Sequence, residues 1–134
     1  MNTFRCKACN KKLNKDDKFC PDCGSKKIIQ ISRRIIFCHP EVKHQLSVHK
    51  TLILGRNHFR LYGDNYKFLS PKQFQIIQTD SGWQIKGLPA PNPTLLNNND
   101  ITEKTVGLQE GDVVKIGNFE IQVKFIEQKI DIEY

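Results

Sequence analysis

Beyond the first quarter of the chain, apolar residues fall into short runs, and several of these runs alternate with polar residues. The clearest is FEIQVKFI at 119–126, where Phe119, Ile121, Val123 and Phe125 have a spacing of two and therefore share one face of a strand. The other runs are residues 33–39, 50–55, 73–79, 82–88, 93–97 and 112–117. No stretch of ten residues convincingly shows the helical period. This pattern predicts a mostly β protein with an antiparallel sandwich or barrel.

Turn-forming residues separate these runs. TDSG at 79–82 and GN at 117–118 are typical of hairpin connections, because Gly and Asn tolerate positive φ. PAPNP at 89–93 predicts a stiff loop, since its prolines fix φ and cannot donate to a sheet, and LNNND at 96–100 predicts a polar turn. Loops held on a rigid sandwich are the usual place for binding residues.

The N-terminal segment has a different pattern, dominated by cysteine and lysine. Cys6 and Cys9 form one Cys-x-x-Cys pair, Cys20 and Cys23 form a second, and ten residues separate the pairs. Each pair suits a tight turn that aims two thiolates at one ion, so the four cysteines predict one tetrahedral, structural Zn²⁺ site. Gly24 permits a positive φ after the second pair. The segment has little apolar content, so the metal is expected to supply most of its folding energy.

Two alternative roles for these cysteines are disfavoured by the sequence. Structural disulfides require an oxidising compartment, which nothing in the sequence indicates. A thioredoxin-type redox pair requires a βαβ surround, which this Lys- and Asn-rich segment lacks. The stretch FCPDCGSK at 19–26 resembles the second knuckle of the zinc-ribbon family.

The net positive charge of the chain is confined to this segment. Residues 1–34 carry ten Lys and Arg against three Asp, whereas the remainder carries eleven basic and eleven acidic residues. Thiolates around zinc neutralise part of that charge, and what remains allows weak contact with nucleic acid or an acidic partner. Phe4 and Phe19 are the only aromatic residues near the knuckles, so a solvated basic face is the favoured reading.

Neither end of the chain predicts a membrane or secretion signal. No apolar run approaches the roughly eighteen residues that a membrane span needs, and the N-terminus lacks the apolar core of a signal peptide. We therefore expect a soluble, cytoplasmic protein without membrane partners.

Four blocks of sequence carry a family resemblance. LILGR at 52–56, FLSPKQFQI at 68–76, residues 82–98 and residues 108–125 resemble, in order, the signature blocks of the forkhead-associated (FHA) domain. The resemblance covers about residues 33–127. It implies an FHA-like β-sandwich that binds phosphothreonine peptides through loops at one end.

The resemblance also implies roles for individual residues. Arg56 matches the arginine that binds the phosphate, a role suited to a permanently charged planar fork. Ser70 matches the serine of the Ser-x-x-His motif, whose hydroxyl donates to the phosphate. Asn92 matches the asparagine of the Asn-Gly-Thr motif, whose side chain holds the peptide backbone. Asn97 matches a later loop asparagine with a structural or peptide-contacting part.

Three positions depart from the family pattern. Gln73 stands in place of the histidine that braces the binding loops, although its amide can still hydrogen-bond there. Pro93 replaces the glycine of Asn-Gly-Thr, and Pro91 stands where a phosphate-contacting threonine is frequent, so donors are lost. Lys72, or Lys67, is expected to supply compensating charge.

Other chemistry-bearing residues receive structural interpretations. Cys38 and Trp83 lie in predicted strands and are expected to be buried in the core. The histidines show no compact ligand spacing and are interpreted as scattered surface residues; they are His39, His44, His49 and His58. No nucleophile–base pair, paired carboxylates or glycine-rich phosphate cradle is found, so an enzyme is not predicted.

The predicted organisation is a zinc ribbon (1–27), a short linker (28–32), an FHA-like sandwich (33–128) and a C-terminal tail (129–134). The linker is apolar enough to form a packed strand rather than a free tether.

Three functional hypotheses follow. In the first, the protein is an adaptor that binds a threonine-phosphorylated partner in Ser/Thr kinase signalling. In the second, a degenerate FHA domain binds proteins independently of phosphorylation. In the third, the ribbon contacts nucleic acid while the sandwich recruits.

Overall fold

The computed structural model describes residues 2–133, and strands dominate them. Two short 3-10 segments, η1 (Arg56–His58) and η2 (Asp64–Phe68), are the helical elements among these residues. The strands are β1 (Asn2–Cys6), β2 (Lys12–Leu13), β3 (Lys27–His39), β4 (Val42–Val48), β5 (Leu52–Leu54), β6 (Phe74–Thr79), β7 (Gly82–Gly87), β8 (Leu95–Leu96), β9 (Asn99–Asp100), β10 (Thr105–Gly107), β11 (Val113–Ile116) and β12 (Phe119–Glu133). The prediction of a mostly β, antiparallel sandwich is confirmed.

The chain divides into two compact units. One comprises residues up to Arg34 together with those from Ile126 onward, and the other comprises Ile35–Phe125. Strands β3 and β12 contribute residues to both units. The stretches expected as linker (28–32) and tail (129–134) therefore lie in strands as far as they are described, because their alternating apolar residues support extended pairing.

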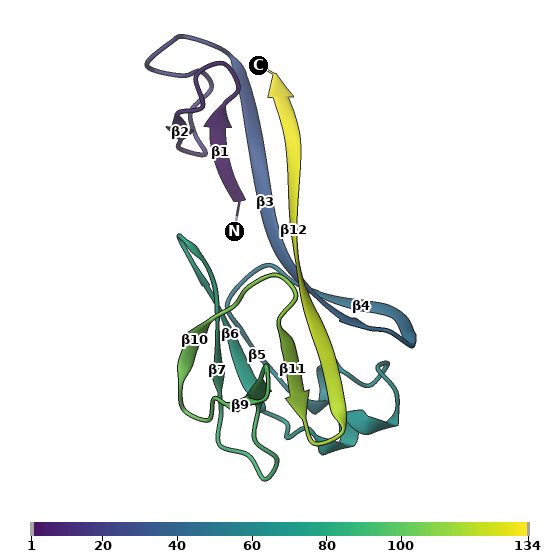
Figure 1. Ribbon diagram of the computed structural model, residues 1–134. Helices are drawn as coiled ribbons and strands as arrows, with labels where there is room; N and C mark the ends of the chain where they lie inside the picture. The colour runs from purple at the N-terminus through teal and green to yellow at the C-terminus, as the bar shows by residue number, and fades with distance from the viewer. Residues whose placement is uncertain (1, 134) are drawn as a thin grey trace. The chain divides into compact units, whose positions relative to one another are not determined.

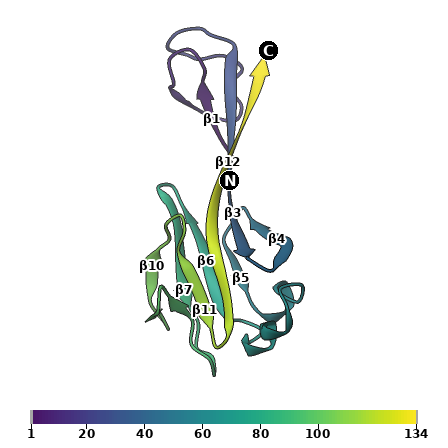
Figure 2. The same ribbon diagram turned by 45° about the vertical axis from the view of Figure 1, so that its right-hand side comes forward.

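The unit 35–125 is a sandwich of two sheets, as Figures 1 and 2 show. One sheet has the order β10-β7-β6-β5, and β6 pairs with β7 through the hairpin turn at 79–82. In the facing layer β12 pairs with β11, β11 with β8 and β8 with β9, while β3 pairs with β4. The hairpin turn at 117–118 joins β11 to β12, as the sequence predicts.

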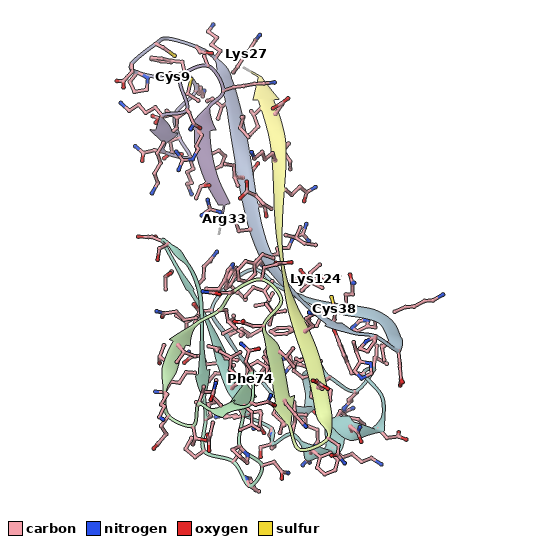
Figure 3. All side chains as sticks on the ribbon, in the orientation of Figure 1. Cys9, Lys27, Arg33, Cys38, Phe74 and Lys124 are labelled. Carbon is pink, nitrogen blue, oxygen red and sulfur yellow. The ribbon has the colours of Figure 1, made fainter. Side chains whose placement is uncertain are left out.

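Aromatic rings fill the core between these sheets. Phe74, labelled in Figure 3, is fully buried. The Phe59 ring packs edge-to-face against Phe37 and Phe119, with centroids 5.8 and 5.3 Å apart. Such pairs add specific geometry to the large apolar area that each ring buries. Trp83 is also buried, which confirms its predicted place in the core.

The long connection between β5 and β6 is held down by its apolar residues. Phe59, Tyr62 and Leu69 are all buried, while Arg56 is exposed. Burial of three large side chains within eleven residues pins an otherwise irregular segment to the core. The segment therefore presents Arg56 from a fixed backbone.

Tyr62 inserts its hydroxyl between β3 and β4. It donates to the Phe37 carbonyl and accepts from the Leu46 N–H, both at 2.6 Å, where these two residues face each other in the sheet. Burial raises the pKa of Tyr62, so the hydroxyl stays protonated as a donor.

We expect Tyr62→Phe to lower the free energy of unfolding by about 1–3 kcal/mol, because it leaves a buried carbonyl and a partly buried N–H without a partner. Urea denaturation measures the loss. The matched control is Tyr66→Phe, in the same segment but only half-buried, for which we expect little change. Equal stability of the Tyr62 variant and the parent would contradict this role of the hydroxyl.

Within the unit 35–125, three strands were not predicted from the sequence pattern. In β4, β9 and β10 most residues are polar and exposed, because these strands lie at the margins of the sandwich and bury little. Cys38 is a correction: it is half-buried rather than buried, and its sulfur accepts a hydrogen bond from Gln45 Nε2 at 3.6 Å.

The unit built on the N-terminal segment has a small core of its own. Strand β1 pairs with β2 on one side and with β3 on the other, and β3 in turn neighbours β12. The core consists of Cys6, Leu13, Cys20 and Ile28, with Phe4 packed against it. So few apolar side chains bury too little area to hold a unit of this size without further support.

Candidate functional site

Arg56 begins η1, two residues after the end of β5, and is anchored to the connection that precedes β6. Its backbone N–H donates to the Ser70 carbonyl at 3.0 Å, and its side-chain Nε donates to the Leu69 carbonyl at 2.9 Å. Among residues 2–133 no partner is found for the two terminal nitrogens of the guanidinium. Arg56 therefore has a fixed inner end and an outer fork open to an anion.

Gly55 allows this close approach of chain segments. A Cβ atom at Gly55 would collide with the backbone carbonyl of Pro71 and would lie 2.6 Å from the carbonyl oxygen of Ser70. A side chain here would push the segments apart, so the glycine before Arg56 is required by packing.

Gln73 connects the two loops of the site. Its side chain is fully buried, and its Oε1 accepts from the Ser70 N–H at 2.8 Å. Its Nε2 donates to the Asn92 carbonyl at 2.8 Å and to Thr94 Oγ1 at 3.0 Å. The expectation that Gln73 hydrogen-bonds where the family has histidine is met, because the amide offers both a donor and an acceptor.

A role for Thr94 was not predicted from the sequence. It is fully buried, and its hydroxyl donates to the Gln73 carbonyl at 3.3 Å. A signal was present, since Thr94 is the third residue of the motif that Asn92 begins. With Gln73 it locks the proline-rich loop to the start of β6.

Asn92 lies beside the loop that carries Ser70. Its Nδ2 donates to the Phe68 carbonyl at 3.0 Å, so the amide group joins the two loops to each other. The Ser70 hydroxyl has no partner within the described part of the chain, and Ser70 is half-buried. The backbones of Arg56 and Ser70 are thus hydrogen-bonded to each other, and Asn92 is joined to the Ser70 loop through its own side chain and that of Gln73.

Asn97 and Lys72 are placed differently. Asn97 Oδ1 accepts from the Val113 N–H at 2.9 Å, and its Nδ2 donates to Asp112 Oδ1 at 3.0 Å. These contacts brace the β8–β9 turn against β11 and give Asn97 the structural part of its expected role. Lys72 and Lys67 are both exposed, and each lies within three residues of Ser70 in the chain.

The loops offer a limited set of groups to a ligand. A guanidinium fork and a hydroxyl are the groups that bind phosphate oxygens, and the two lysines add charge without fixed geometry. Pro91 and Pro93 are exposed in the facing loop and have no N–H to donate. The site is suited to a single phosphate held mainly by Arg56.

The second candidate centre is the cluster of Cys6, Cys9, Cys20 and Cys23. Their four sulfur atoms lie within 4.8 Å of one another, with Cys6 3.5 Å from Cys23 and Cys9 3.5 Å from Cys20. The cluster mixes one buried and one exposed cysteine from each knuckle. Cys9 is labelled in Figure 3.

The two knuckles have the same backbone geometry. Asn10 N–H donates to the Cys6 carbonyl and Gly24 N–H to the Cys20 carbonyl, both at 2.8 Å. Asn10 and Gly24 both have positive φ, 63° and 73°, which confirms the expected role of Gly24. Each chain reversal therefore follows the second cysteine of its pair.

Backbone donors around the sulfurs favour thiolates. A hydrogen bond from the Cys9 N–H, together with a smaller one from Ala8, lowers the pKa of Cys6 to about 6. The Lys11 N–H favours the Cys9 thiolate, but the hydrogen bond with Cys20, partial desolvation and the other sulfurs raise the pKa of Cys9 to about 12. Four crowded sulfurs resist joint ionisation, and a dication relieves that repulsion.

The cluster therefore fits a tetrahedral metal ion with four thiolate ligands. Zinc prefers this ligand set, and a site with four protein ligands leaves no open position for a substrate. The cluster is compatible with a structural metal.

In the described residues no helix is long and apolar enough to cross a membrane.

Part of the chain is similar to known proteins. Residues 52–117 match the FHA domain family. An FHA domain-containing protein of Arabidopsis thaliana is 38% identical over 60 residues, a stretch that covers 43% of this chain and 16% of that protein. The chain thus spans about a sixth of the length of this relative.

Solved structures give the same result for the fold. The FHA domain of an Arabidopsis thaliana hypothetical protein is 31% identical, with a TM-score of 0.55, covering 71% of this chain and 86% of that one. The N-terminal FHA domain of S. cerevisiae Rad53p, solved with a phosphothreonine peptide, is 22% identical, with a TM-score of 0.52, covering 69% and 92%. The latter identity supports the fold alone.

Proposed function

Because residues 52–117 of this chain match the FHA domain family, we propose that the protein is an adaptor that binds threonine-phosphorylated partners through the loops around Arg56. FHA domains are interaction modules known for binding phosphothreonine peptides in signalling, and a Ser/Thr kinase that modifies the partner is part of the proposal. The observation that carries it is the anchoring of Arg56 through Nε to the Leu69 carbonyl, with its fork left open.

Arg56 supplies most of the phosphate recognition in this proposal. With Nε already bonded, its two terminal nitrogens donate to two phosphate oxygens as charge-assisted bonds. The Ser70 hydroxyl donates a further bond. The free Oδ1 of Asn92 accepts from a peptide N–H, while its Nδ2 stays on the Phe68 carbonyl.

In this proposal the four-cysteine unit has a structural role, and the sandwich binds the phosphopeptide. Cys6, Cys9, Cys20 and Cys23 would hold a zinc ion, which supplies four bonds that fix the two knuckles to each other. The ion takes no part in phosphate binding. We propose that this zinc ribbon stabilises its own unit and offers a basic surface to a partner.

We expect Arg56→Ala to weaken binding of a degenerate phosphothreonine peptide library by about 100-fold, because charge-assisted bonds of roughly 1.5–3 kcal/mol are lost. Fluorescence anisotropy with the zinc-loaded protein measures the change. Arg60→Ala is the matched control, since Arg60 is also exposed but donates to Asn57 at 2.8 Å.

The outcome of the same titration can contradict the proposal. Undiminished phosphopeptide binding by the Arg56→Ala protein would remove Arg56 from the site. An unphosphorylated library that binds as tightly as the phosphorylated one would remove the phosphate from the function.

A second candidate function is phosphorylation-independent binding to proteins. Two observations favour it. The Asn92 Nδ2 group already donates to the Phe68 carbonyl, and the neighbouring Pro91 and Pro93 have no N–H to donate to a phosphate. Equal affinity for phosphorylated and unphosphorylated partners would select this candidate.

A further inference from the structure

Strand β12 has an open edge along its last part. Its neighbours in the sheet are β3 and β11, and the pairing with β11 ends where Val113 faces Gln122. Within the unit that contains residues 126–133, β3 lies on one side of the strand, and no other described strand covers the opposite side (Figures 1 and 2). An uncovered edge presents backbone groups to a further strand.

The hydrogen bonds before this part show which residues face the open side. Val123 donates to the Asp112 carbonyl at 2.8 Å and accepts from the Gly111 N–H at 2.9 Å, both on the β11 side. The Phe125 N–H donates a hydrogen bond to the Glu110 carboxylate at 2.5 Å. Because backbone groups alternate sides along a strand, residues 127, 129 and 131 point their N–H and C=O groups outward.

The side chains of this edge carry alternating charges on one face and isoleucines on the other. Glu127 lies 3.6 Å from Arg33 Nε and 3.8 Å from Lys129 Nζ, and Asp131 lies 3.0 Å from Lys7 Nζ. On the opposite face Ile126 is 40% exposed and Ile130 is 46% exposed. Two exposed isoleucines beside open backbone donors make this edge a candidate interface.

We propose that this edge pairs with the same edge of a second copy of the chain, antiparallel, about a twofold axis at Gln128. In this register Glu127 of each copy faces Lys129 of the other, so both ion pairs are attractive. The backbone groups of Glu127 and Lys129 both point to the open side, so each Glu127–Lys129 pair exchanges two backbone hydrogen bonds between the copies. Ile126 faces Ile130 in the intervening pairs, which brings the exposed isoleucines together.

The neighbouring registers are electrostatically less favourable. An axis at Lys129 sets Lys129 against itself and Glu127 against Asp131. An axis at Glu127 sets that acid against itself. An axis at Ile130 pairs Lys129 with Asp131 but sets Glu127 against Glu133, so its attractive and repulsive pairs offset each other. An axis between two residues would oppose outward with inward backbone groups. Like charges directly opposite are destabilising in a sheet.

The interface is short, so the expected dimer is weak. A strand pair of this length lies below the roughly 1,200 Å² that stable interfaces bury, which favours dissociation constants in the micromolar range or above. The association requires no phosphate and is independent of Arg56.

The test uses the full zinc-loaded chain and two charge-reversal variants, Glu127→Lys and Lys129→Glu. Each variant alone opposes like charges in the proposed register, whereas an equal mixture opposes unlike charges in a mixed dimer. Sedimentation equilibrium from about 5 to 500 µM measures the mass, and Lys50→Glu, an exposed lysine outside the edge, is the control.

We expect concentration-dependent dimerisation of the parent and the control, at least a tenfold weaker dimer for each variant alone, and recovery in the mixture. A parent that stays monomeric at the highest concentration overturns the proposal. Variants that dimerise as the parent does, or a mixture that stays monomeric, overturn it equally, since the fold of each variant is checked by its thermal melting curve.

Discussion

Chelating the metal from the zinc-loaded protein is expected to unfold the unit of residues 2–34 and 126–133 while residues 35–125 stay folded. The core of that unit is Cys6, Leu13, Cys20 and Ile28, and two of these four residues are sulfur ligands. Apparent binding energies of structural zinc reach about 10–16 kcal/mol at neutral pH, far more than so few apolar side chains supply. The sandwich has a separate and much larger core.

Hydrogen exchange, followed by segment before and after addition of EDTA, measures this loss. The amides to follow are those of β1 and of residues 28–32 in β3, which pair with β1. They should lose protection in EDTA and regain it when zinc is restored. Cys23→Ser should reproduce the effect of chelation. Cys38→Ser is the control, because Cys38 lies outside the cluster. Amides of β1 that stay protected in excess EDTA would show that the metal is dispensable for this unit.

The second large effect is expected at Gln73. Gln73→Leu puts an apolar side chain of similar size in this buried position and leaves the Ser70 N–H and the Asn92 carbonyl without partners. Because unsatisfied groups cost about 1–3 kcal/mol each and the network is connected, we expect the free energy of unfolding to fall by about 3–5 kcal/mol.

Chemical denaturation measures this loss, and phosphopeptide titration should show weaker binding as the two loops separate. Gln75→Leu is the matched control, since Gln75 lies two residues later, within β6, and is only half-buried. Gln73→His restores part of the network with the family's usual residue and should recover part of the stability. Equal stability of the leucine variant and the parent would show that the loops are held by other contacts.

The predictable part of this protein rests on local patterns. Alternation at Phe119 to Phe125 predicts the strand because a period of two places apolar residues on one face, and that face is buried as far as Val123. The paired cysteines predict the metal cluster because their spacing alone brings two sulfurs together in each knuckle. The β4 strand is missed because Val42–Val48 buries only one residue, so its pairing with β3 leaves little trace in the pattern.

The sequence by itself therefore determined the β architecture, the cluster of four cysteines and the position of Arg56 after Gly55, but not that residues 126–133 belong to the unit of the N-terminal segment. Tertiary structure alone decided which groups at the site remain available. It commits the Asn92 amide to Phe68, Asn97 to Asp112 and the Gln73 side chain to two loops, and it leaves the fork of Arg56 open. The physical reason is that these bonds join residues far apart in the chain, and such pairings depend on how the sheets and loops pack rather than on spacing.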